Sequence, residues 1–217
     1  MIGHRIAKFA LSGMAILGAT LPLAAVAQAD VGKNQKARET LDKLGQCLAV
    51  VRSAEVGRYL SNPGDSTWYE VTARRNDEAP CVGLYMITAS QSAMRGAVAE
   101  AWYLINHADG APAVFSRAEN AAPPQAEAVQ RIAAASEEAR AQVIVDEFAR
   151  CVAATMPVQV DALLRTPVAS AAESEAVETL STGFAPCVFE GQKLGFDAET
   201  LRAALAFALV RRAMHEA

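Results

Sequence analysis

A pattern that contains two cysteines occurs twice in this chain of 217 residues. Three blocks recur in the same order with only small changes in spacing, so matches between alanine-rich segments do not explain them. The matching blocks are 44–49 with 148–153, 79–82 with 185–188, and 94–101 with 201–208. The first two pairs of blocks contain all four cysteines. The sequence therefore predicts two tandem related units that can be compared position by position.

The duplication also predicts the boundaries of these units. The first copy covers residues 30–108 and the second covers 126–217. Residues 109–125 contain Gly110, Pro112, Pro123 and Pro124, which are typical of a linker.

The first 29 residues have the pattern of a signal peptide for export. Arg5 and Lys8 precede an apolar run over 9–27, and small residues then alternate up to Ala27 and Ala29. We expect cleavage after Ala29, with cleavage after Ala27 as the alternative. A membrane anchor is disfavoured, because the apolar run is at the short limit for a bilayer and Pro22 lies within it. The sequence thus predicts a periplasmic protein with no membrane span in the mature chain.

Both copies are expected to be helical, which gives an all-α fold. Apolar residues at helical spacing predict a first helix over 36–52, repeated over 142–154. A short second helix follows in each copy, capped by Ser53 or Thr155, and Pro157 suits the first turn of the latter. Pro63 and Pro167 end these helices.

The remaining elements follow from similar signals. Ser174 is expected to cap a third helix through Leu180. A long last helix follows each second cysteine, over 90–106 in the first copy and over 197–214 in the second. Residues 84–88 and 193–196 are expected to be extended.

The even number of cysteines in an exported chain indicates disulfides. A unit that once stood alone must close its own bond, so the duplication selects Cys47–Cys81 and Cys151–Cys187 from the three pairings that four cysteines allow. A loop of about 35 residues gives roughly 3 to 4 kcal/mol of stability per bond. Free thiols and a metal site are the alternatives. We expect no metal, because neither Cys-x-x-Cys nor a histidine at ligand spacing is present.

Charge and missing motifs exclude several classes of function. Removal of Arg5 and Lys8 with the signal peptide changes the net charge from −4 to −6. An acidic chain lacks the basic surface that binds nucleic acid. The glycine-rich and catalytic motifs of nucleotide-binding proteins, serine hydrolases and zinc proteases are absent, so no cofactor is expected.

Polar residues that recur in both copies are the best candidates for a site. Arg95 and Arg202 open the last helices, and Asp42 and Asp146 lie on the first helices. We expect each arginine to be mainly structural, paired with the acid of its own copy or with carbonyls at a helix end. The alternative is that the two arginines bind an anion, since a guanidinium matches a carboxylate or a phosphate.

Aromatic residues of the first copy and one histidine are secondary candidates. Trp68, Tyr69, Tyr85, Trp102 and Tyr103 have no aromatic counterparts, and Trp102 and Tyr103 are candidates to line a binding groove, although core packing also explains them. His107 is expected to lie at the end of a helix that Gly110 terminates. The alternative is a general base.

The second copy combines Cys151, the Leu163–Leu164 pair, Thr166–Pro167, Pro186–Cys187 and Leu201–Arg202. This pattern resembles a family of exported tandem-repeat proteins with cysteine pairs from alphaproteobacteria such as sphingomonads. The first copy departs from it at Ser61 and at Gly96. The resemblance covers most of the mature chain, implies a Gram-negative periplasmic location and supplies no activity.

These observations favour a soluble periplasmic helical-repeat protein with a non-enzymatic binding, adaptor or envelope-maintenance role. Its expected partner is a small ligand or another envelope protein. The alternative is a hydrolase-like enzyme with a site between the copies near His107.

Overall fold

The computed structural model describes residues 23–62, 81, 89–112, 115, 125–189 and 195–216, and throughout this part of the chain the only regular elements are helices. The all-α prediction is therefore confirmed. Residues 84–88, expected to be extended, lie outside the described residues, as do Trp68, Tyr69 and Tyr85. The elements are α1 (Leu23–Val51), α2 (Ser53–Ser61), α4 (Gln91–Asn106), α5 (Gln125–Ala134), α6 (Glu137–Thr155), α7 (Pro157–Leu164), α8 (Ala171–Ser181), a 3₁₀ turn (Ala185–Cys187) and α9 (Ala198–Glu216).

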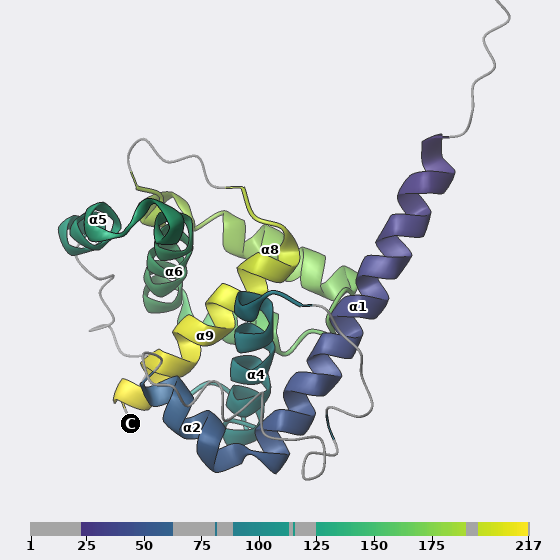
Figure 1. Ribbon diagram of the computed structural model, residues 1–217, viewed down its shortest axis with the longest axis horizontal. Coiled ribbons are helices and arrows are strands. Elements are labelled where there is room, and N and C mark those ends of the chain that lie inside the picture. Colours follow the sequence, from purple (N-terminus) through teal and green to yellow (C-terminus); the bar gives the residue numbers. More distant parts are fainter. Residues whose placement is uncertain are drawn as a thin grey trace, which may run out of the picture.

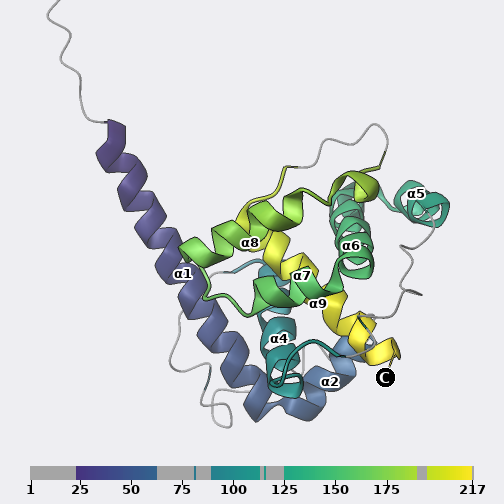
Figure 2. The same cartoon turned by 180° about the vertical axis from the view of Figure 1, so that it is seen from behind.

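Helices α4 and α9 cross at the centre of the molecule and carry the other helices on their flanks (Figure 1). Helix α1 packs along α4, and α6 packs in the same way along α9. Helices α7 and α8 pack against each other on the side seen in Figure 2, and α5 lies outside α6. The N-terminal end of α1 projects beyond the other helices in Figures 1 and 2.

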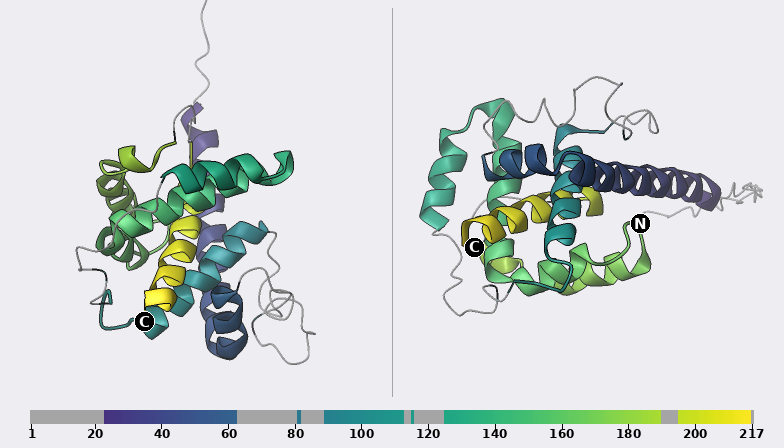
Figure 3. Two further views of the ribbon diagram at one scale, coloured as in Figure 1. Left: turned by 90° about the vertical axis from the view of Figure 1, so that its left-hand side faces the viewer. Right: turned by 90° about the horizontal axis from the view of Figure 1, so that it is seen from below.

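The central crossing depends on two very small residues. A Cβ atom added to Gly96 of α4 would lie 2.3 Å from the Cα atom of Ala203 on α9, so only glycine fits there. In the duplicated sequence pattern, Gly96 and Ala203 occupy the same position. The two last helices thus meet at equivalent residues, and both views in Figure 3 show α9 and α4 in this crossed arrangement.

One hydrophobic core spans both halves of the chain, which we call the N-terminal half (30–108) and the C-terminal half (126–217). Leu48, Leu60 and Val98 from the N-terminal half belong to the same buried cluster as Phe148 and Leu205 from the C-terminal half. Among the described residues, the two halves therefore share one hydrophobic core.

Both predicted disulfides are present. The Cα atoms of Cys47 and Cys81 are 5.7 Å apart, and those of Cys151 and Cys187 are 5.5 Å apart. Each bond ties the C-terminal part of a long helix, α1 or α6, to the segment that leads into α4 or α9. Among the described residues no cysteine is free.

Several helix ends match the expectations. The Ser90 hydroxyl accepts a hydrogen bond from the backbone N–H of Ala93 at the start of α4, and Asp197 caps α9 through the N–H of Thr200. Helix α4 ends at Asn106, and Gly110 follows with a φ of 124° that favours glycine. Pro157 occupies the first turn of α7 as predicted.

Other expected caps are wrong. Ser53 is the first residue of α2, and the cap position before it is Arg52. Thr155 ends α6 and donates its hydroxyl back to the carbonyl of Cys151, so it does not cap α7. Helix α8 starts at Ala171 with Ser170 as its cap, ahead of the expected Ser174. Helices α2 and α7 thus start without a side-chain cap, whereas Ser170 accepts the hydrogen bond at the start of α8.

Helix lengths also differ from those expected. Helix α1 begins at Leu23 and α6 at Glu137, both earlier than the apolar periodicity indicates, and Ser136 caps α6. Helix α5 was not expected from the sequence, although Ala128 and Ile132 give it a buried face at helical spacing. Within the described residues, no helix combines the length and the apolar character that a membrane crossing requires.

Candidate functional site

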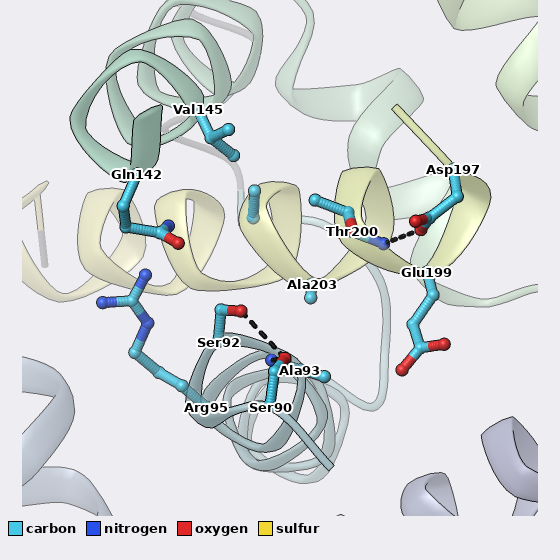
Figure 4. A pocket seen from close by; sticks show the side chains of 11 residues that line it. Ser90, Ser92, Ala93, Arg95, Gln142, Val145, Asp197, Glu199, Thr200 and Ala203 are labelled. Carbon is cyan, nitrogen blue, oxygen red and sulfur yellow. Dashed lines mark hydrogen bonds between the residues drawn. The ribbon is translucent and has the colours of Figure 1, made fainter. Parts of the chain in front are cut away.

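A cavity of about 210 Å³ lies beside the crossing of α4 and α9, where α6 forms its third wall. Figure 4 shows polar side chains from all three helices converging on it. Arg95 and Gln142 lie on one side, Asp197 and Glu199 on the other, and Ser90 and Ser92 between them. The described residues that line it are Ser90, Ser92, Ala93, Arg95, Gln142, Val145, Asp197, Glu199, Thr200, Ala203 and Ala204. We call this the open cavity.

The geometry of the open cavity follows from how α4 and α9 begin. Both helices start next to it, and their caps, Ser90 and Asp197, are themselves part of the lining. The small side chains of Ala93, Ala203 and Ala204 leave space between the helix axes. The cavity is therefore a consequence of a close helix crossing whose first turns diverge.

Arg95 is the only cationic side chain in this lining. Its Nη2 donates to Asp146 Oδ1 of α6 at 3.0 Å, and its Cζ atom lies 4.2 Å from the ring centre of Phe207. The buried Nε atom has no hydrogen-bond partner. The side chain of Arg95 is 18% exposed and that of Asp146 is 38% exposed, so water reaches this ion pair.

The expected pairing of Arg95 with Asp42 is wrong. Asp42 instead accepts a hydrogen bond from Gln46 on its own helix, and the acid that meets Arg95 belongs to the other half of the chain. The reason is the crossing of α4 over α9, which directs the first turns of α4 toward α6.

A second, smaller cavity of about 30 Å³ lies on the other side of the crossing, and we call it the closed cavity. Its lining includes Arg38 and Asp42 of α1, Glu100 of α4, and Arg202 of α9. Arg202 is buried there with a side-chain exposure of 4%. Its Nε and Nη2 atoms bind both carboxylate oxygens of Glu100, at 2.8 and 2.5 Å.

Further partners complete a buried cluster of charges around Arg202. Its Nη1 donates to Glu173 of α8 at 3.2 Å, and Arg38 donates to the same carboxylate oxygen at 2.6 Å. Arg202 Nη2 also donates to the carbonyls of Leu164 and Thr166 at the end of α7. Two arginines and two glutamates thus balance in charge away from water.

The predicted role of Arg202 is confirmed in part. It is structural and it binds carbonyls at a helix end, but its acids are Glu100 and Glu173, and the expected Asp146 pairs with Arg95. Burial raises the pKa of Glu100, and Arg202 only partly offsets this. Burial alone would lower the pKa of Arg202, but Glu100 and Glu173 outweigh it and raise that pKa.

The aromatic candidates lie away from both cavities. Tyr103 is fully buried, and its hydroxyl donates to Asp161 Oδ1 at 2.7 Å. Burial, the largest cause, and Asp161 both raise the pKa of Tyr103. Trp102 is partly buried, and its Nε1 would lie 3.8 Å from a Cβ added to Gly57 of α2. Core packing accounts for both aromatic residues.

His107 lies at the C-cap of α4, and its position at the end of a helix was expected from the sequence. Its ring centre is 4.8 Å from that of Tyr103, and Arg165 donates to its carbonyl oxygen. Burial lowers the pKa of His107, Arg165 lowers it further, and Asp161 opposes them. The Asp161 carboxylate is already bound by Tyr103 and by Arg165, and His107 lines neither the open nor the closed cavity.

Most residues of the open cavity were not singled out in the sequence. Gln142, Ser92 and Glu199 carry no motif, and only the comparison of the two copies could have drawn attention to them. Where side chains are described, no three histidine, cysteine, aspartate or glutamate residues gather as metal ligands.

Comparisons with protein-family models, with curated proteins and with solved structures each found no match to this chain. The lining and the charges of the two cavities are therefore the basis for assigning a function.

Proposed function

We propose that this chain is an exported periplasmic protein that works by binding a small polar molecule in the open cavity. The observation that carries the proposal is the convergence of charged, hydroxyl and amide side chains from α4, α6 and α9 on one space of about 210 Å³. Concave sites with a few converging polar groups are where proteins hold small ligands. The site contains no nucleophile activated by a base, so binding is favoured over catalysis.

The periplasmic location rests on the N-terminal pattern and on the two disulfides. Disulfides form and persist in oxidising compartments, and both bonds have ordinary Cα separations. Cleavage after Ala29 would leave Asp30 as the first residue and would shorten the projecting end of α1. The intact mass of the secreted protein tests this, and a mature form that retains Met1 would contradict it.

The proposal includes a duplicated origin for the two halves. Helix α1 packs on α4 as α6 packs on α9, and the central crossing places Gly96 against its counterpart Ala203, which supports this origin. Each half also closes its own disulfide. Ion pairs nevertheless connect the two halves, since Arg95 binds Asp146 and Arg202 binds Glu100. We therefore propose one interlocked domain made from two related sequences.

A substitution at the mouth of the open cavity tests the binding role. Thr200 is exposed and lines the cavity, so Thr200→Trp should fill the space without burying a new group in the core. Thr179→Trp on α8 is the matched control, because Thr179 is equally an exposed helical threonine and lies outside the lining.

Native mass spectrometry of protein purified from periplasm gives the readout. We expect a bound small molecule on the wild type and on Thr179→Trp, and its loss from Thr200→Trp. Retention of the same molecule by folded Thr200→Trp would place binding elsewhere and overturn the assignment of the open cavity.

A further inference from the structure

We propose that the ligand of the open cavity is a small zwitterion of the amino-acid type, held by its carboxylate at Arg95 and by its ammonium group at Glu199 and Asp197. This inference rests on the proposed binding function and adds the chemical class of the ligand. It is drawn from the comparison of the open cavity with the closed cavity.

The two cavities have corresponding linings. Residues that match in the duplicated sequence recur as wall residues of the two cavities, and Ala93, Glu199 and Ala203 line both. With the open cavity first, the matching pairs are Gln142 and Arg38, Val145 and Leu41, Arg95 and Arg202, Ser92 and Glu199, Thr200 and Ala93, Ala203 and Gly96, and Ala204 and Ala97. The open and the closed cavity therefore have corresponding walls, and protein side chains fill most of the closed cavity.

The closed cavity is filled by carboxylates of the protein itself. Glu100 binds Arg202 through Nε and Nη2, and Glu173 binds it through Nη1. This is the two-pronged geometry with which a guanidinium recognises a free carboxylate. The closed cavity thus shows which chemical group suits the arginine at this position.

The open cavity lacks the carboxylate that corresponds to Glu100. Phe207 stands at that position, and its ring stacks on the guanidinium of Arg95. Arg95 donates to Asp146 through Nη2, and the Tyr59 hydroxyl also interacts with its guanidinium. Its Nε atom is buried and has no hydrogen-bond partner. A stacked guanidinium that is partly exposed in the lining of a polar cavity is suited to a carboxylate that comes from a ligand.

The opposite side of the open cavity is suited to a cation. Figure 4 shows Asp197 and Glu199 across from Arg95, with the hydroxyls of Ser90 and Ser92 between them. Asp197 uses one of its two carboxylate oxygens to cap α9. Because Asp146 already offsets the charge of Arg95, a simple anion would meet net repulsion from these acids, whereas a zwitterion satisfies both ends.

The volume limits the size of such a ligand. Pockets for drug-sized molecules are about 300 to 1,000 Å³, and the open cavity is about 210 Å³. A free amino acid fits this limit better than a peptide or a sugar chain.

Isothermal titration of the mature, disulfide-bonded protein with the common L-amino acids tests the inference. Propionate and ethylamine are the matched probes for alanine, because each retains only one of its two charged groups. We expect at least one amino acid to bind, and we expect analogues that lack either charge to bind about 10- to 100-fold more weakly.

Two variants separate the roles of the two ends. Arg95→Gln and Glu199→Gln should each weaken the binding of that amino acid about 10- to 100-fold, because each removes one charged hydrogen-bond partner. Arg140→Gln and Glu178→Gln are the controls, since both residues are exposed and lie outside the lining. Circular dichroism confirms that each variant is folded, and Arg95→Lys, which retains the charge, should recover part of the affinity.

The possible failures are distinguishable. Suppose that inorganic phosphate, an amine or a neutral solute binds the wild type but not Thr200→Trp, and that no amino acid binds. The ligand class is then wrong and the binding function stands. If no solute binds the wild type and none co-purifies with it, the binding function itself is overturned. Equal affinity of alanine and propionate would also refute the zwitterion.

Discussion

The buried charge cluster gives the sharpest test of how this fold is held together. Arg202→Met removes both bonds that hold the Glu100 carboxylate and leaves it buried, whereas Glu173 retains Arg38 and the backbone N–H of Ala169. Leaving one member of a buried pair uncompensated costs about 3 to 5 kcal/mol. At roughly 2 to 4 °C per kcal/mol for a chain of this size, Tm should fall by about 6 to 20 °C.

A second variant separates the charge from the shape. Glu100→Leu combined with Arg202→Met removes one positive and one negative charge and leaves the pair of Arg38 and Glu173 intact. Replacement of a whole buried pair by apolar residues is often neutral, so the double variant should recover most of the lost stability. Arg140→Met is the control, because Arg140 is exposed and donates to the carbonyl of Ala135 at the protein surface, so its loss should cost less than about 0.5 kcal/mol.

Thermal and urea unfolding measure both effects in oxidised protein. A loss below about 1 kcal/mol for Arg202→Met would refute the reasoning, because it would mean that Glu100 finds water or another partner. A double variant as unstable as the single one would show that packing around Arg202, and not its charge, carries the stability.

Three further predictions concern the ion pair, the disulfides and pH. Arg95→Ala and Asp146→Ala should show a coupling of about 0.5 to 1 kcal/mol in a double-mutant cycle by urea unfolding, since the pair is partly exposed; strictly additive effects would remove the pair as a contributor. Replacing both Cys151 and Cys187 by alanine should lower stability by about 2 to 5 kcal/mol, measured by the shift in the urea midpoint, and an unchanged midpoint would contradict this. Burial raises the pKa of Glu100 above 4.5, so Glu100 keeps its proton to higher pH in the folded state than in the unfolded state, and its contribution to stability falls as pH rises from 4.5 through the folded-state pKa. In urea unfolding, the stability of the wild type relative to Glu100→Gln should decline as pH rises above 4.5. A stability difference that is independent of pH would contradict the shift.

Local signals in the sequence were sufficient for much of the fold. Helical periodicity identified the long helices, and Ser90 and Asp197 cap α4 and α9 as expected because a short polar side chain reaches the first free N–H groups of its own helix. The disulfide pairing was predicted from the even number of cysteines and from the repeated sequence pattern, which assigns one bond to each copy, and the structure has these two bonds. The predicted cap was wrong where two nearby residues could each occupy the cap position, as with Ser170 and Ser174 at the start of α8.

The partners of the arginines were decided by the tertiary structure alone. The sequence showed that Arg95 and Arg202 recur with two aspartates, but the crossing at Gly96 turns each last helix toward the other half of the chain. Arg95 therefore meets Asp146, and Arg202 meets Glu100. Ion pairs depend on distances of a few ångströms between side chains of different helices, and no local pattern along one helix specifies those distances. The open and the closed cavity both lie beside this crossing, and their linings likewise come from helices that are distant in the sequence.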